Sequence, residues 1–129
     1  MHNKTCWACG PENIHGLKLE VKCDKNTGES GTSFFVDGRY AGNDGIAHGG
    51  VICSIFDSVM THAAMALSER RVFTAKLEVK FKKKITVGET ITVRCRFEKK
   101  HFGFLVIKGE IKNGENKVAA KADAYFAEQ

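Results

Sequence analysis

Proline occurs only once in the 129-residue sequence, at Pro11, so no proline-rich linker divides the chain into parts. The longest charge-free stretch, residues 45–56, is too short and too rich in glycine to span a membrane. Residues 1–10 include a lysine, a histidine and two cysteines in place of the apolar core of a signal peptide. We therefore expect a single domain over residues 1–129, located in the cytoplasm and without a membrane partner.

Cysteine occurs five times, an odd number that cannot be paired completely within one chain. Cys23, Cys53 and Cys95 stand alone within apolar patterns, which indicates reduced thiols that are buried as small hydrophobic groups. The sequence therefore predicts three separate, reduced cysteines in the interior.

The other two cysteines, Cys6 and Cys9, form a Cys-x-x-Cys pair that has two interpretations. With His2 and His15 as the third and fourth ligands, the pair could hold a structural zinc ion. Because the chain has only one such pair, a packing role is favoured, in which the segment of residues 1–16 packs on the rest of the domain. We therefore predict no metal and no other cofactor.

The net charge is +5, and two local runs carry much of the excess: "KFKKK" at residues 80–84 and "EKKH" at residues 98–101. Such a basic surface suits a phosphate-bearing partner, which could be nucleic acid, a membrane surface or a phosphorylated cofactor. The simpler interpretation is a solvated strand end that its lysines keep soluble. We expect no nucleic acid partner, because the first run has one aromatic residue, Phe81, which the alternation of its strand points inward.

Six segments are predicted to be strands, and four of them alternate apolar and polar residues with the two-residue period of half-buried strands, while residues 31–37 and 104–112 are recognised by the turns that bound them. In "TAKLEVKF", residues 74–81, the alternation places Ala75, Leu77, Val79 and Phe81 on the buried side. The six predicted strands cover residues 17–23, 31–37, 74–81, 90–98, 104–112 and 117–127.

Between the second and third of these strands, residues 49–67 carry apolar side chains at the helical spacings of three and four. No other helix is predicted, so this one must cover the apolar face of the strands. The sequence therefore predicts an α+β fold in which one long helix lies in the curve of an antiparallel sheet. The apolar stripe of the helix consists of Ile52, Ile55, Phe56, Val59, Ala63 and Ala66.

One carboxylate, Asp57, interrupts this otherwise uncharged helix and points about 140° away from the centre of the apolar stripe. Between Gly45 and Ser68 there is no Lys, Arg or Glu, the residues that a water-facing side would favour. Such a face is typical of a surface that another subunit covers, which would place Asp57 in a subunit cleft. The alternative is that Asp57 belongs to the polar side of an amphipathic helix. The small or weakly polar neighbours on this face are Cys53, Ser54, Met60, Thr61 and Ala64.

The helix begins at His48-Gly49-Gly50, where the glycines let a ligand approach the backbone. The first N–H groups of a helix have no partner inside it and lie at the positive end of the helix dipole, so they can stabilise a developing oxyanion. Asp57 follows eight residues after Gly49, a little over two turns along the same helix. One rigid element thus offers the minimum for hydrolysing an activated acyl group.

The segment "GIAHGGVICSIFD" resembles the His-Gly-Gly-x6-Asp signature of hotdog-fold acyl-CoA thioesterases of the phenylacetate-pathway (PaaI-like) type. Upstream, "CWACGPENIHGLKL" is similar to the Cys-x-x-Cys-Gly, Asn-x-x-Gly-Leu opening of a subgroup of these proteins. Downstream, "TAKLEVKFKKKITVGE" resembles their next strand and turn. The resemblance implies a hotdog fold, in which a curved antiparallel sheet wraps one long central helix. It also implies hydrolysis of an acyl-CoA substrate by a homodimer or homotetramer.

The same resemblance implies a role for each matching residue. The backbone N–H of Gly49 polarises the thioester carbonyl, and Asp57 is the nucleophile or the general base towards water. His48 shapes the loop and binds the substrate, while Thr74, reached from the partner subunit, positions the attacking water. The implied substrate-binding residues are Gly50, Asn43, Lys82, Lys83 and Lys84, with the three lysines near the phosphates of coenzyme A.

The chain departs from the family at position 42, where relatives often carry an amide that steadies the active site about six residues before the histidine. Here Gly42 occupies that position, and Asn43 follows one residue late. This departure keeps open a second interpretation, a non-catalytic protein that binds acyl-CoA in the same cleft. A second departure, Lys84 in place of a frequent proline, changes an edge and leaves the chemistry unaffected.

Overall fold

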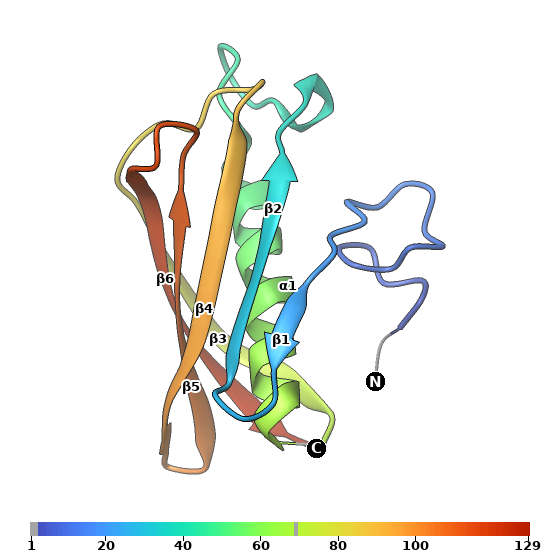
Figure 1. Cartoon of the computed structure of the whole chain (residues 1–129), viewed down its shortest axis with the longest axis vertical. Coiled ribbons are helices and arrows are strands. Elements are labelled where there is room, and N and C mark those ends of the chain that lie inside the picture. The colour runs from blue at the N-terminus through green and yellow to red at the C-terminus, as the bar shows by residue number, and fades with distance from the viewer. Residues whose placement is uncertain (1–2, 69) are drawn as a thin grey trace.

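The computed structural model describes residues 3–68 and 70–129. In this part of the chain, six strands form one antiparallel sheet in the order β1-β2-β4-β5-β6-β3, and one α-helix lies against it (Figure 1). A 3-10 turn, Gly38–Tyr40, follows the second strand and leads towards the helix. The elements are β1 (Lys22–Asp24), β2 (Glu29–Phe35), α1 (Gly49–Ser68), β3 (Val72–Phe81), β4 (Thr90–His101), β5 (Phe104–Lys112) and β6 (Val118–Glu128).

The hydrophobic core lies between α1 and the inner face of the sheet, which curves around the helix (Figure 1). Burying one apolar stripe of a helix and one face of a sheet is the main favourable term in the folding of such a layered domain. The α+β prediction and the hotdog arrangement of one long helix in a curved antiparallel sheet are confirmed. The fully buried residues include Ile55, Phe56 and Val59 from α1 and Ile91, Val93, Ile107, Ile111 and Phe126 from the sheet.

By length and composition, α1 could also cross a membrane, because it is 20 residues long and apolar. Half of its most apolar window is buried inside the protein. That degree of burial is typical of the core helix of a globular domain, in which the sheet takes the place of lipid around the apolar stripe.

The first predicted strand, residues 17–23, is wrong over most of its length, because regular pairing begins only at Lys22. Lys18 has a φ of 52°, in the left-handed region, which interrupts an extended strand. Leu17 and Leu19 are nevertheless buried, and their N–H groups donate to carbonyl oxygens of the N-terminal segment. In residues 17–19 the apolar alternation therefore predicts correctly which side chains are buried, although the backbone does not form a strand.

Burial of the three separate cysteines is confirmed for only one of them. Cys95 on β4 is 3% exposed, and burial raises the pKa of its thiol to about 12. Cys53 is half-buried, and Cys23 is exposed. Cys23 lies in the short edge strand β1, where the core no longer covers the side chains.

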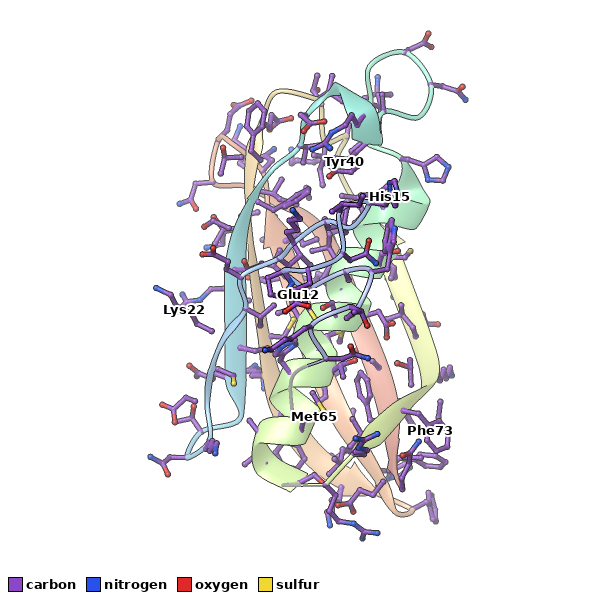
Figure 2. All side chains as sticks on the ribbon, turned by 90° about the vertical axis from the view of Figure 1, so that its right-hand side faces the viewer. Glu12, His15, Lys22, Tyr40, Met65 and Phe73 are labelled. Carbon is purple, nitrogen blue, oxygen red and sulfur yellow. The ribbon has the colours of Figure 1, made fainter. Side chains whose placement is uncertain are left out.

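The N-terminal segment, of which residues 3–16 are described, lies over one side of α1, as Figure 2 shows with Glu12 and His15 labelled on it. Ala8 and Cys9 are each 8% exposed and belong to the same buried cluster as the helix residues. His2, a candidate zinc ligand in the sequence, lies outside the described residues. The segment thus extends the core on the side of the helix that faces away from the sheet's centre.

Candidate active site

The start of α1 leaves one backbone N–H group available. The Gly50 N–H donates to Nδ1 of the His48 ring at 2.9 Å, and the N–H groups of Val51 and Ile52 donate to the His48 carbonyl oxygen. In the described part of the chain, no group accepts a hydrogen bond from the Gly49 N–H. Because a helix start stabilises negative charge, Gly49 is the donor best placed for an oxyanion.

His48 acts as the side-chain cap of the helix. Its Nδ1 accepts from Gly50, so the neutral ring carries its proton on Nε2, on the far side from the helix start. The His48 N–H donates to the Tyr40 carbonyl oxygen at 2.8 Å, which ties the ring to the loop before α1. His48 is exposed, so Nε2 can donate to a ligand.

The loop before the helix explains the departure at position 42. The Gly42 N–H donates to the Ile46 carbonyl oxygen at 2.7 Å, and a Cβ on Gly42 would lie 3.3 Å from the His48 Cα. A side chain at this position would therefore press on His48, and glycine allows the loop to close against it. Asn43 is exposed at the turn, and its carbonyl oxygen accepts from the Ile46 N–H, so the structure does not bring it to Asp57.

Asp57 is half-buried on α1 and is held by a threonine of the same chain. The Thr74 hydroxyl donates to Asp57 Oδ1 at 2.5 Å. This corrects the expectation that Thr74 is reached from the partner subunit, because β3 runs beside α1 within one chain. A carboxylate fixed in this way has one oxygen oriented by Thr74 and the other left for chemistry.

A β-bulge in β3 turns Thr74 towards the helix. Thr74 pairs with Phe126, whereas Lys76 pairs with Tyr125, so Ala75 is an extra residue in the ladder. Leu77 faces the helix, so a regular strand would place both Lys76 and Thr74 on the opposite, outer face of the sheet. Ala75, predicted to be buried, is exposed instead. The bulge thus re-aims one side chain, as bulges near functional sites commonly do.

Phe81 is a site residue that the sequence analysis missed, because the alternation predicted it to be buried. Its side chain is on the predicted side of β3 but is 54% exposed. A Cβ built on Gly49 would lie 3.7 Å from Phe81 Cζ, so the ring lies beside the start of the helix. An aromatic ring next to the free Gly49 N–H offers an apolar surface to a ligand bound there.

Gly49 and Asp57 of one chain are too far apart to contact the same reacting group of a substrate. Eight residues of helix, at about 1.5 Å each, separate them by about 12 Å. Reacting groups must approach within about 3.5 Å. Each chain therefore carries two half-sites, one at the helix start beside Phe81 and one at the carboxylate beside Thr74.

The three lysines after Phe81 run beside the loop that precedes α1. Lys82, Lys83 and Lys84 are exposed, and within the described residues none forms an ion pair. The next residue, Ile85, accepts the Ala47 N–H at 2.7 Å. Lys82 also lines a groove of about 1010 Å³ on the outer face of the sheet. The three lysines therefore lie close to the start of α1, and Lys82 borders the groove on the outer face of the sheet.

Comparison with known proteins gives one match by sequence and many by structure. Residues 44–120 match the sequence profile of the thioesterase superfamily, which is more than half of the chain. A search of curated proteins found no match.

Three solved structures illustrate the structural likeness. A thioesterase superfamily protein is 20% identical, with a TM-score of 0.84 over 97% of this chain, which spans 61% of that protein's length. The E. coli PaaI protein from the phenylacetic acid degradation operon is 18% identical, over 88% of this chain and 80% of that one, with a TM-score of 0.79. A Streptococcus mutans protein bound to acetyl CoA is 17% identical, over 86% and 88%, with a TM-score of 0.79. At these identities the likeness concerns the fold.

Proposed function

Because this chain belongs to the thioesterase superfamily, we propose that it hydrolyses an acyl-CoA thioester to the free acid and coenzyme A. The observation that carries the proposal is the pairing, on one helix, of a free Gly49 N–H with a carboxylate that Thr74 orients. The binding of acetyl CoA by the similar S. mutans protein supports the choice of substrate class.

In the proposed reaction, the thioester oxygen accepts a hydrogen bond from the Gly49 N–H, where negative charge develops. The Asp57 carboxylate removes a proton from water as the water oxygen attacks the carbonyl carbon, or attacks that carbon itself. The C–S bond then breaks, and coenzyme A leaves as a thiolate that takes up a proton. In the second route, water hydrolyses the acyl-aspartate anhydride and restores the carboxylate.

The two half-sites can be joined by pairing two copies of the chain along β3. β3 is the last strand in the sheet order, and within the described residues its only strand partner is β6. Thr74 marks the Asp57 end of β3, and Phe81 marks the Gly49 end. Antiparallel pairing about a two-fold axis between Leu77 and Glu78 would therefore place Asp57 of one protomer near Gly49 of its partner. We propose this homodimer, alone or as half of a homotetramer.

A shared site predicts complementation between two inactive variants. Asp57→Asn removes the carboxylate, and Gly49→Val fills the approach to the free N–H, where a Cβ contacts only the end of the Phe81 ring. In a refolded equal mixture, half of the dimers are mixed and each has one intact site of two. We expect about a quarter of wild-type activity, although each variant alone is inactive. Activity that stays at the level of the single variants would contradict a site shared between protomers.

Thr74 is proposed as a positioning residue for the carboxylate. Thr74→Val keeps the shape and removes the donor to Asp57, so we expect kcat to fall about tenfold, which corresponds to about 1.4 kcal/mol. Thr74→Ser restores the hydroxyl and is expected to keep most of the activity. KM should change little in both variants, because Thr74 orients a catalytic group. A matched rise in KM with unchanged kcat would instead assign Thr74 to substrate binding.

The remaining substrate-binding residues have separate roles in this proposal. Lys82, Lys83 and Lys84 would attract the phosphates of coenzyme A beside the helix start. The Gly50 N–H already donates to His48, so Gly50 contributes to substrate binding only because it has no side chain that would block the approach to the helix start. Asn43 would contact the substrate only from the exposed loop.

The direct test is release of free thiol from a panel of acyl-CoA esters. Turnover of any member that exceeds the uncatalysed rate supports the hydrolase. The second candidate, a non-catalytic acyl-CoA binder, follows from Gly42 in the position of the amide, and it predicts saturable binding without thiol release. Absence of both binding and turnover across the panel would reject both functions.

A further inference from the structure

The N-terminal Cys-x-x-Cys pair forms a closed turn in which the two sulfur atoms are neighbours. The Gly10 N–H donates to the Cys6 carbonyl oxygen at 2.8 Å, and a Cβ on Gly10 would lie 2.4 Å from the Cys6 nitrogen. Only glycine can close so tight a turn. Residues three apart in a turn have Cα atoms within about 7 Å, and a disulfide needs roughly 4.4–6.8 Å. The Cys6 and Cys9 thiols are close enough for each to affect the pKa of the other.

The two sulfurs differ in exposure and in their surroundings. Cys6 is half-buried, whereas Cys9 is 8% exposed. Backbone N–H groups of Cys9, Ala8 and Gly10 lie near the Cys6 sulfur and favour its charged form. Burial alone would raise the pKa of Cys6, but these donors and the Cys9 thiol hold it below the ordinary value, while burial raises the pKa of Cys9. A reachable thiol with a lowered pKa beside a buried thiol is the arrangement of an attacking and a resolving cysteine.

We propose that Cys6 and Cys9 are a redox-active dithiol that hydrogen peroxide converts to an intramolecular disulfide. The Cys6 thiolate attacks one peroxide oxygen, the O–O bond breaks, and hydroxide leaves, which gives a sulfenic acid. The Cys9 sulfur then attacks the Cys6 sulfur, and the hydroxyl group leaves as water. In total, the two thiols lose two electrons and two protons, and peroxide is reduced to two molecules of water.

The other cysteines are not equivalent to this pair. Cys23 is exposed in β1, whereas Cys95, which lies on the other side of Ser30 in β4, is buried with a raised pKa. Zinc would require four ligands, and in residues 3–68 and 70–129 no third His, Cys, Asp or Glu side chain joins the pair. A disulfide needs only the two thiols that the turn already brings together.

The pair lies against the helix that carries the proposed catalytic carboxylate. The Cys9 thiol adjoins the Ser58 hydroxyl, which follows Asp57 in α1 and has no hydrogen-bond partner of normal geometry within the described residues. Oxidation removes the Cys9 proton from this contact. The redox proposal does not depend on hydrolysis, since its evidence is the state of the thiols.

The test uses the full reduced chain, treated with hydrogen peroxide and then alkylated, with peptide mapping by mass spectrometry. We expect loss of two of the five thiols, a linked Cys6–Cys9 peptide lighter by two hydrogen atoms, and full recovery with dithiothreitol. Cys9→Ser should stop at a Cys6 sulfenic acid that dimedone traps. At neutral pH, iodoacetamide should modify Cys6 several-fold faster than the exposed Cys23.

The matched control is Cys23→Ser, which removes an exposed thiol and should form the Cys6–Cys9 disulfide at the wild-type rate. Mapping of the wild-type chain needs no variant, so the result stands even if Cys9→Ser folds poorly. Retention of all five thiols under peroxide, or first oxidation at Cys23, would overturn the proposal. Zinc bound by the purified protein through Cys6 and Cys9, and protecting both thiols, would overturn it in favour of a metal site.

Discussion

Replacing Asp57 with asparagine is expected to lower kcat for acyl-CoA hydrolysis by about a hundred- to ten-thousandfold. Asparagine has nearly the same shape, and its Oδ1 can still accept the Thr74 hydroxyl, so the site stays assembled. The amide can neither take a proton from water nor act as a carboxylate nucleophile. The measurement is thiol release over a range of acyl-CoA concentrations, from which kcat and KM are separated.

The control for this substitution is Asp24→Asn, which makes the same chemical change on an exposed residue of β1. Its Oδ1 accepts the Asn26 N–H, and an asparagine oxygen can do the same. Wild-type kcat is expected for this variant, and equal thermal midpoints for all three proteins would exclude unfolding as the cause. Wild-type turnover by Asp57→Asn would remove Asp57 from the mechanism.

Truncating Phe56 to alanine is expected to lower the free energy of unfolding by about 3–5 kcal/mol. Phe56 is fully buried on the core stripe of α1, and a Cβ on Gly109 of β5 would lie 3.3 Å from its ring. The ring therefore fills the space that a glycine in the sheet leaves open, and its loss creates a cavity that the strands cannot close without bending. Urea unfolding at a fixed protein concentration measures the difference.

Phe102→Ala is the matched control, because the same side chain is removed at the tip of the β4–β5 turn, where Phe102 is 89% exposed. Its effect should stay within about 0.5 kcal/mol of wild type. Similar losses in the two variants would mean that Phe56 does not fill the core as the structure indicates.

The fold could be predicted from the sequence because burial leaves a periodic pattern. The helix stripe from Ile52 to Ala63 and the alternation in residues 90–98 follow from one buried face each. The pattern failed where the backbone departs from regular geometry, as at Lys18 with its positive φ. Periodicity reports which side chains are buried and not the dihedral angles between them.

The candidate site could be predicted only in part. Gly49 and Asp57 could be proposed together because both lie in one predicted helix with a fixed spacing, and the structure places both in α1. Thr74 was assigned to the partner subunit from the resemblance alone, whereas it contacts Asp57 of its own chain. The bulge that turns it towards the helix could not be predicted, because nothing in the local alternation shows an extra residue. Phe81 was missed because its position beside Gly49, a residue far away in the sequence, arises only in the folded chain.

The strand order has a consequence for the synthesis of this protein. β3 finds its intramolecular partner, β6, only when the chain has been made about forty positions further. Until then a nascent chain on the ribosome displays both edges of β3 beside an apolar helix, which is a surface that favours aggregation. Cotranslational protection by a chaperone therefore matters most during the interval between the emergence of β3 and the emergence of β6.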